Sequence, residues 1–141
     1  MRISKKDYED LVAKGIIPSP PKPKSKVAQY KSKAEAQFAW ELQDQLEAGK
    51  IEWWAYEPVT LVIADADGVR CRYTPDFLVL GWMPHEDDPG WTQAVYTFYE
   101  VKGFLRESAR IRFLAAKERY PFWNFVMVRK KKGGGFETIM G

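Results

Sequence analysis

The stretch that decides the fold is residues 96–104, YTFYEVKGF. Its aromatic and β-branched residues predict a β-strand, and Gly103 marks where that strand stops. Glu100 and Lys102 stand two positions apart in it. Because side chains alternate between the two faces of a strand, both charges project from the same face. Alone, this pattern favours an ordinary same-face ion pair on an edge strand.

Composition predicts one folded domain. The chain has 141 residues, of which 45% are hydrophobic and 29% are charged, a balance typical of globular proteins with a core. A formal net charge of +3 does not by itself indicate a nucleic-acid partner. Lysines do cluster near both ends, where they could contact phosphates, although solubilising charge is the more common role of any single lysine.

Several classes of protein are excluded by residue counts. One cysteine and one histidine leave no disulfide within the chain, no cysteine-based zinc site and no multi-histidine metal site. No apolar run approaches the roughly 18 residues of a membrane span. The first residues, MRISKKDYEDLV, contain no apolar signal region. We therefore expect a cytoplasmic protein.

The first thirty residues are expected to be an appendage. Residues 4–14 resemble a short helix, and the proline-dense segment 17–25 favours an extended basic tether. We predict an N-terminal arm over residues 1–30 and the main domain over 31–141. The clearest helix covers residues 32–48, with Ser32 as its N-cap and Gly49 at its end.

Strand and turn signals fill the rest of the chain. Asp67-Gly68 predicts a hairpin turn, residues 81–90 a long loop, and residues 108–120 a helix that Pro121 stops. Together they predict an α/β or α+β fold (αβββαβ), a central mixed sheet of four or five strands flanked by helices. The expected strands are residues 51–56, 59–64, 69–80, 96–102, 122–128 and 136–139.

Asp76 changes the interpretation of Glu100 and Lys102. It precedes the apolar run FLVL, where an unpaired buried acid would be costly, and Pro75 suits a strand edge or bulge. Two carboxylates beside one ammonium are electrostatically unfavourable unless a cation joins them. A hard divalent ion with oxygen ligands, Mg²⁺ above all, would solve this problem.

Pro75-Asp76 followed by Glu100-Val-Lys102 resembles the signature of the PD-(D/E)XK nuclease superfamily. Glu35, on the helix before the sheet, matches the extra glutamate of that superfamily. The wider pattern, KSKAEAQFAWEL, YTPDFLV and YEVKGF, is similar to a phage-encoded subfamily of Holliday-junction-resolvase-like endonucleases. The similarity covers roughly residues 30–130. The separation of Asp76 from Glu100 is long for the family, and we attribute it to an inserted loop at residues 81–94.

The resemblance implies a restriction-endonuclease-like core and Mg²⁺-dependent hydrolysis of DNA phosphodiesters, with Mn²⁺ as a substitute, in phage replication or recombination. Glu35, Asp76, Glu100 and Lys102 would be catalytic, and Asp76, Glu100, Glu35 and the Val101 carbonyl would hold the metal. It further implies branched DNA as partner, a homodimer, because a junction needs two cuts, and the host cytoplasm as location. Candidate DNA contacts are Lys31, Lys33, Gly103, Arg106, Arg110, Arg112, Lys130 and Lys131.

Each assignment has an alternative. Ser32 and Glu35 also fit a capping box, and Asp76 a turn acid. The basic residues of helix 108–120 fit a solvated face. Tryptophans at 53, 54, 82 and 91, with Phe104, fit a dimer face or base stacking, although core packing is the more common role. For the whole chain, the alternatives are a nicking or end-processing nuclease on duplex or single-stranded DNA, and an inactive nucleic-acid-binding protein on the same fold.

Overall fold

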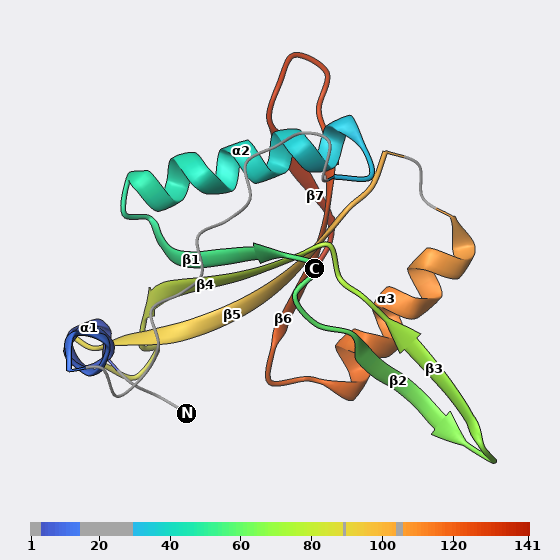
Figure 1. Cartoon of the computed structure of the whole chain (residues 1–141), viewed down its shortest axis with the longest axis horizontal. Helices are drawn as coiled ribbons and strands as arrows, with labels where there is room; N and C mark the ends of the chain where they lie inside the picture. The colour runs from blue at the N-terminus through green and yellow to red at the C-terminus, as the bar shows by residue number, and fades with distance from the viewer. Residues whose placement is uncertain (1–3, 15–29, 89, 104–105) are drawn as a thin grey trace.

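A mixed sheet forms the centre of the protein (Figure 1). The computed structural model describes residues 4–14, 30–88, 90–103 and 106–141. The sheet has five strands in the order β1-β4-β5-β6-β7. Neighbours are antiparallel except β5 and β6, which are parallel and joined through α3 (Glu107–Arg119). The strands are β1 (Ile51–Tyr56), β4 (Phe77–Pro84), β5 (Thr92–Val101), β6 (Asn124–Lys130) and β7 (Phe136–Met140). The coarse prediction of an α+β fold with a mixed sheet and helices is confirmed.

Helix α2 (Lys33–Glu47) covers one face of the sheet. Its buried side chains pack on Trp54, Phe77 and Val101 and form one core cluster. The opposite face is covered by α3 and by a separate hairpin of β2 (Leu61–Ala66) and β3 (Val69–Tyr73) (Figure 1). Phe98 and Phe113 belong to the core cluster on that side. The sheet therefore lies between two apolar layers.

One strand prediction was wrong, and one loop prediction was wrong in part. Residues 69–80 are not one returning strand but two, β3 and β4, which belong to different sheets. The break falls at 74–76, because Pro75 has no N–H to donate to a sheet and restricts the residue before it. The inserted loop proposed for residues 81–94 is half strand, since Gly81, Trp82, Met83 and Pro84 pair with Val95, Ala94, Gln93 and Thr92, and only the segment between β4 and β5 remains as a connection.

Local signals placed the element ends well. Ser32 Oγ accepts a hydrogen bond from Glu35 N (3.1 Å) at the start of α2. Gly49, just after α2, has φ 74°, and the turn Asp67-Gly68 has φ values of 52° and 75°. These are left-handed conformations that glycine, and to a lesser degree asparagine and aspartate, adopt at low cost.

The N-terminal helix is α1 (Lys5–Ala13). It lies beside the end of β4 and the start of β5 (Figure 1). The proline-dense part of the expected arm falls on residues 15–29, outside the described part of the chain, so the division at residue 30 stays a prediction. Among the residues that the structure describes, no helix is long and apolar enough to cross a membrane.

Candidate active site

The residues of the acidic motif meet where three strands come together. Phe77 at the start of β4 pairs with Tyr99 of β5, so continuing this register by one residue places Asp76 opposite Glu100. Asp76 Oδ2 accepts a hydrogen bond from Val101 N (2.8 Å). On the other side, Glu57 N, just beyond β1, donates to the Asp76 carbonyl (2.8 Å). The chain thus fixes Asp76 by its backbone and by its carboxylate.

Glu100 is held by two groups from different elements. Its Oε2 accepts a hydrogen bond from Tyr73 Oη (2.7 Å), and its Oε1 lies 2.8 Å from Lys102 Nζ. Glu100 is only 6% exposed, and β5 is flanked on both sides by other strands. The same-face ion pair is present, but its expected place on an edge strand is wrong, because β5 is an inner strand and Glu100 is buried. A buried ion pair costs desolvation energy, so it is weak grounds for a purely stabilising role.

Glu35 reaches the same strand ends from α2. It lies on the buried face of the helix with Phe38, as the helical spacing predicted. Its Oε2 accepts a hydrogen bond from Tyr56 Oη (2.5 Å), at the end of β1. Ser32 supplies its half of a capping box, whereas the Glu35 carboxylate is directed to Tyr56 in the strand layer. Capping by Ser32 and a role for Glu35 in the site are thus compatible.

The surroundings of Asp76 raise its pKa. Burial first, and then the negative charge of Glu100, raise it to about 8, and Glu35 adds to the rise. The Val101 N–H and the Lys102 ammonium act in the opposite direction without cancelling it. Without a cation, Asp76 therefore holds a proton near neutral pH. A bound cation would favour the ionised form.

The donor set fits a hard divalent cation in its chemistry. Three buried carboxylates from Glu35, Asp76 and Glu100 offer only oxygen, which Mg²⁺ prefers. Each has a protein hydrogen bond, and a carboxylate has about four acceptor positions, so capacity for further partners remains. As they stand, the described side chains do not form a group of three His, Cys, Asp or Glu already arranged to hold a metal.

Sequence reasoning missed three contributors to this cluster. Tyr73 and Tyr56 anchor the carboxylates of Glu100 and Glu35. Burial, with a lesser contribution from the neighbouring carboxylates, raises the pKa of both phenols well above its usual range, which keeps them protonated as donors. The third, Glu57, has φ 45°, a strained conformation for a non-glycine residue. Tyrosine is common in strands, so neither phenol stood out as a site residue.

Among the predicted DNA contacts, Lys31 lies near the carboxylates, and Lys33 and Gly103 are close to Glu35 and Lys102 in the sequence. Lys31 Nζ lies 2.7 Å from Glu57 Oε1, and this hydrogen bond raises the pKa of Lys31, with small contributions from Glu35 and Asp76. Lys33 is exposed at the start of α2. Gly103 is exposed just beyond Lys102, and a Cβ there would meet nothing within 4 Å. Lys33 and Gly103 are therefore open to a ligand, whereas Lys31 is paired with an acid.

The other basic candidates lie elsewhere. Arg106, Arg110 and Arg112 are exposed, and Arg110 pairs with Glu107 at 3.3 Å. The side chains of α3 that face the core are Phe113 and Ala116. This agrees with the solvated-face alternative for these arginines. Lys130 and Lys131 are exposed where β6 leads into the hairpin loop before β7.

The aromatic candidates divide between core and surface. Trp54 is buried in the α2 cluster, and Trp82 Nε1 donates to Glu52 (3.0 Å). Trp53 is half-buried, and Trp91 is 56% exposed near α1. Phe104 lies outside the described residues.

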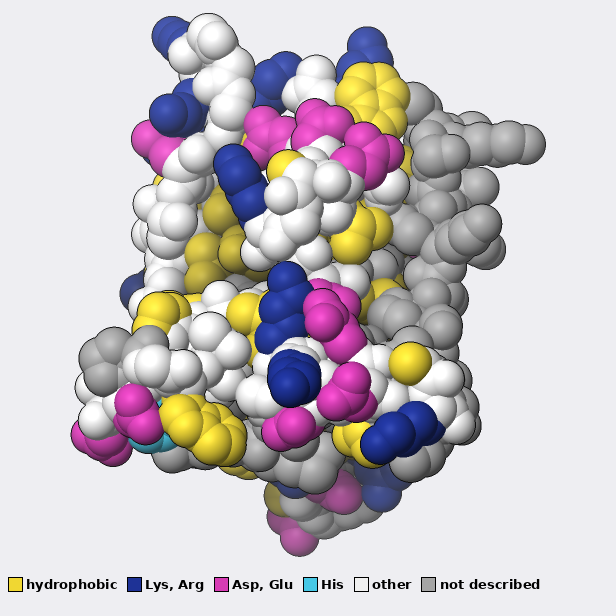
Figure 2. Space-filling view, turned by 90° about the vertical axis from the view of Figure 1, so that its left-hand side faces the viewer, with side chains coloured by type: hydrophobic (Ala, Val, Ile, Leu, Met, Phe, Trp, Pro, Cys, Tyr) yellow, Lys and Arg dark blue, Asp and Glu magenta, His cyan; other side chains and the backbone are white. Residues whose placement is uncertain are grey.

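The end of the molecule that carries α1 mixes Lys and Arg with Asp and Glu rather than gathering cations (Figure 2).

Comparisons of the chain with protein-family models, with curated proteins and with solved structures gave no match. Asp76, Glu100, Lys102 and Glu35 remain the features of the chain that point to a function.

Proposed function

We propose that this protein is a Mg²⁺-dependent endodeoxyribonuclease of the PD-(D/E)XK type. The observation that carries the proposal is the pairing of Asp76 with the Glu100–Lys102 motif across two neighbouring strand ends. The order of helix, strands, helix and strand around this pairing is consistent with a restriction-endonuclease-like core. Glu35 adds a third carboxylate from the preceding helix, as the sequence resemblance implies.

Charge is the physical support for a metal-dependent role. Burial, and then the charge of Glu100, raise the pKa of Asp76 to about 8, so its ionised form is unfavourable there unless a cation intervenes. Glu35, Asp76 and Glu100 would hold the metal, together with the Val101 carbonyl next to the N–H that fixes Asp76. When bound, Mg²⁺ lowers the pKa of a coordinated water and offsets negative charge on the phosphate.

Besides the metal ligands, Lys102 and Tyr73 would take part in the reaction. The Lys102 ammonium lies 2.8 Å from Glu100 with its side chain 24% exposed, so it can turn towards an anion at the surface. It would orient the attacking water or neutralise a non-bridging phosphate oxygen. Tyr73 keeps Glu100 in place, which limits the rearrangement needed during the reaction.

Branched DNA is the substrate we favour, on the resemblance to the resolvase-like subfamily alone. The test is a panel of labelled four-way, flap, duplex and single-stranded DNAs, incubated with Mg²⁺ or with EDTA. Paired cuts across the four-way junction, absent in EDTA, are the expected result. Cleavage of duplex, flap or single strands instead would favour the nicking or end-processing alternative.

Matched variants connect any cleavage to the site. Asp76→Asn should abolish cleavage and leave DNA binding in EDTA largely intact. Asp87→Asn, an exposed acid in the β4–β5 turn, is the control and should cleave like the wild type. A fully active Asp76→Asn protein would refute the assignment. DNA binding without cleavage in Mg²⁺ or Mn²⁺ would instead support the alternative of an inactive nucleic-acid-binding protein.

A further inference from the structure

A groove of about 710 Å³ lies between α2 and the β6–β7 hairpin. The residues that line it do not include Glu35, Asp76, Glu100 or Lys102. Because β6 is parallel to β5, the β6–β7 loop leaves the sheet at the same strand ends as Glu100, next to α2 (Figure 1). The groove is lined on the helix side by Gln37, Trp40, Glu41 and Asp44, and on the hairpin side by residues 130–136.

The hairpin side of the groove is cationic and open. Lys130, Lys131 and Lys132 are all exposed, and a run of three glycines follows them. Gly133, Gly134 and Gly135 have φ values of 89°, 110° and 75°, so side chains there would strain the loop. A Cβ on Gly133 or Gly134 would meet nothing within 4 Å, which leaves this backbone accessible to a ligand.

The helix side of the groove is aromatic and acidic. Trp40 is 50% exposed, although its neighbour Ala39 is buried in the core. Burial, followed by the charge of Asp44, raises the pKa of Glu41, while Lys131 lowers it. A phosphate would be repelled by these acids and attracted by the lysines. A nucleobase, by contrast, stacks well on an indole and donates amino hydrogens to carboxylates.

We propose that this groove binds a single strand of nucleic acid, with its phosphates on Lys130–Lys132 and a base stacked on Trp40. The polarity of the two walls sets this orientation. The binding does not require catalysis, so it stands apart from the proposed nuclease activity. A nucleic-acid strand bound in the groove would lie next to the end of the sheet that carries Asp76 and Glu100.

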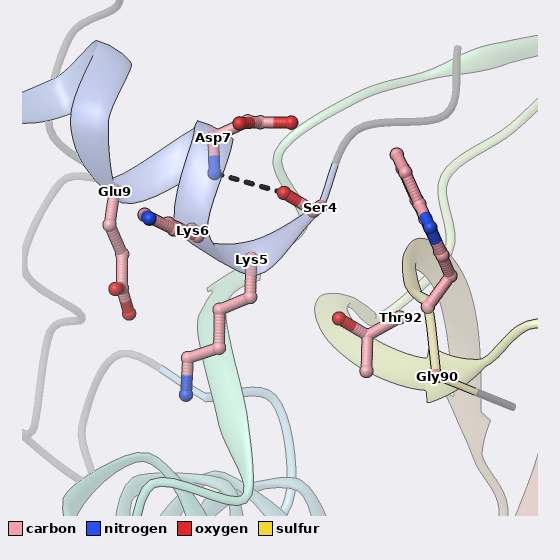
Figure 3. Close-up of a pocket in the computed structure, with 8 residues that line it drawn as sticks. Ser4, Lys5, Lys6, Asp7, Glu9, Gly90 and Thr92 are labelled. Carbon is pink, nitrogen blue, oxygen red and sulfur yellow. Dashed lines mark hydrogen bonds between the residues drawn. The ribbon is translucent and has the colours of Figure 1, made fainter.

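A hollow at the other end of the molecule provides a matched control. It also measures about 710 Å³ and lies between α1 and the start of β5 (Figure 3). Trp91 lines it and is 56% exposed. Its lysines, Lys5 and Lys6, share the helix with Asp7 and Glu9 (Figure 3). It therefore offers an equally exposed indole without an uninterrupted run of cations.

The experiment measures fluorescence anisotropy of labelled single-stranded DNA, single-stranded RNA and duplex DNA in EDTA, where no metal-dependent cleavage occurs. Trp40→Ala should weaken single-strand binding by about 5- to 150-fold, the range for loss of one stacked base, and should change duplex binding little. Trp91→Ala should bind like the wild type. Circular dichroism is the control for folding. We expect both variants to fold, because both indoles are exposed.

A salt titration tests the lysine wall separately. Replacing Lys130, Lys131 and Lys132 together by serine should reduce the slope of log affinity against log salt by about 2, given roughly 0.7 per neutralised phosphate of a single strand. The double variant of Lys5 and Lys6 to serine should leave the slope unchanged. Wild-type affinity in Trp40→Ala, or an equal loss in Trp91→Ala, would overturn the proposal. Loss in Trp40→Ala alone supports it, whether or not the protein cleaves DNA.

Discussion

Replacing Asp76 by asparagine should make the metal-free protein more stable near neutral pH while removing the proposed nuclease activity. The carboxylate is destabilising because it is buried beside Glu100, which raises its pKa to about 8. In the unfolded chain an aspartate has a pKa of about 3.9. As pH rises above about 4, the unfolded state loses this proton while the folded state keeps it, so stability falls until the folded pKa is passed.

The size of the effect follows from the gap between the two pKa values. Each pH unit inside the gap costs about 1.4 kcal/mol. At pH 7 this gives an upper value of about 4 kcal/mol, and because Glu100 and Glu35 can share the repulsion we expect about 2–4 kcal/mol. Asparagine does not ionise, and its side-chain oxygen can still accept from Val101 N. For a chain of this size, the melting temperature should rise by about 6–12 °C.

The assay is thermal unfolding of wild type, Asp76→Asn and the control Asp87→Asn in EDTA, over a series of pH values between about 4 and 8. The stability advantage of Asp76→Asn should grow with pH and should vanish near pH 4. Mg²⁺ added at neutral pH should stabilise the wild type by mass action, because the proposed site would bind the ion only in the folded protein. It should have little effect on Asp76→Asn.

Two results would refute this reasoning. An Asp76→Asn protein that is less stable than the wild type at neutral pH would mean that the carboxylate is stabilising and not crowded. A difference in stability that stays constant between acidic and neutral pH would mean that Asp76 does not titrate in this range. Either outcome would remove the electrostatic argument for a cation in the site.

Three further predictions concern the supports of the site and the core. Tyr73→Phe removes the hydroxyl that donates to Glu100 at 2.7 Å; it should raise the Mg²⁺ concentration needed for half-maximal cleavage and cost about 1 kcal/mol of stability in urea unfolding. Lys102→Met should lower the cleavage rate by about 100-fold or more, with DNA affinity in EDTA nearly unchanged by anisotropy, and a rate near wild type would count against its role. Phe113→Ala should destabilise the protein by about 3–5 kcal/mol, because this side chain of α3 is fully buried against the sheet, and a loss below about 1 kcal/mol in urea unfolding would contradict its place in the core.

Element ends could be predicted where one residue decides the backbone. Ser32, Gly49 and the turn Asp67-Gly68 act through local hydrogen bonds or a left-handed φ, which need no knowledge of distant partners. The pairing of residues 81–84 with residues 92–95 had no such signal. Glycine and proline there indicated a loop, and only the tertiary register makes them strand.

The charged residues of the candidate site stand out in the sequence for a different reason. An acid in apolar surroundings costs free energy unless something compensates it, so Asp76 and Glu100 stand out against their neighbours in the sequence. The structure adds that both are buried and held by protein donors. Their grouping depends on strand pairing, which the sequence indicated only through the resemblance of the motif.

The error in the fold and the missed tyrosine at residue 73 have one cause. A continuous strand over residues 69–80 would have carried Tyr73 and Phe77 in the same sheet. Because the chain breaks at Pro75, Tyr73 instead ends the separate β2–β3 hairpin, which packs on the face from which Glu100 projects. Its hydroxyl can then donate to Glu100 across the two sheets. The same break leaves Asp76 at the very start of β4, opposite Glu100, so Pro75 sets the position of one carboxylate and of the donor that holds the other.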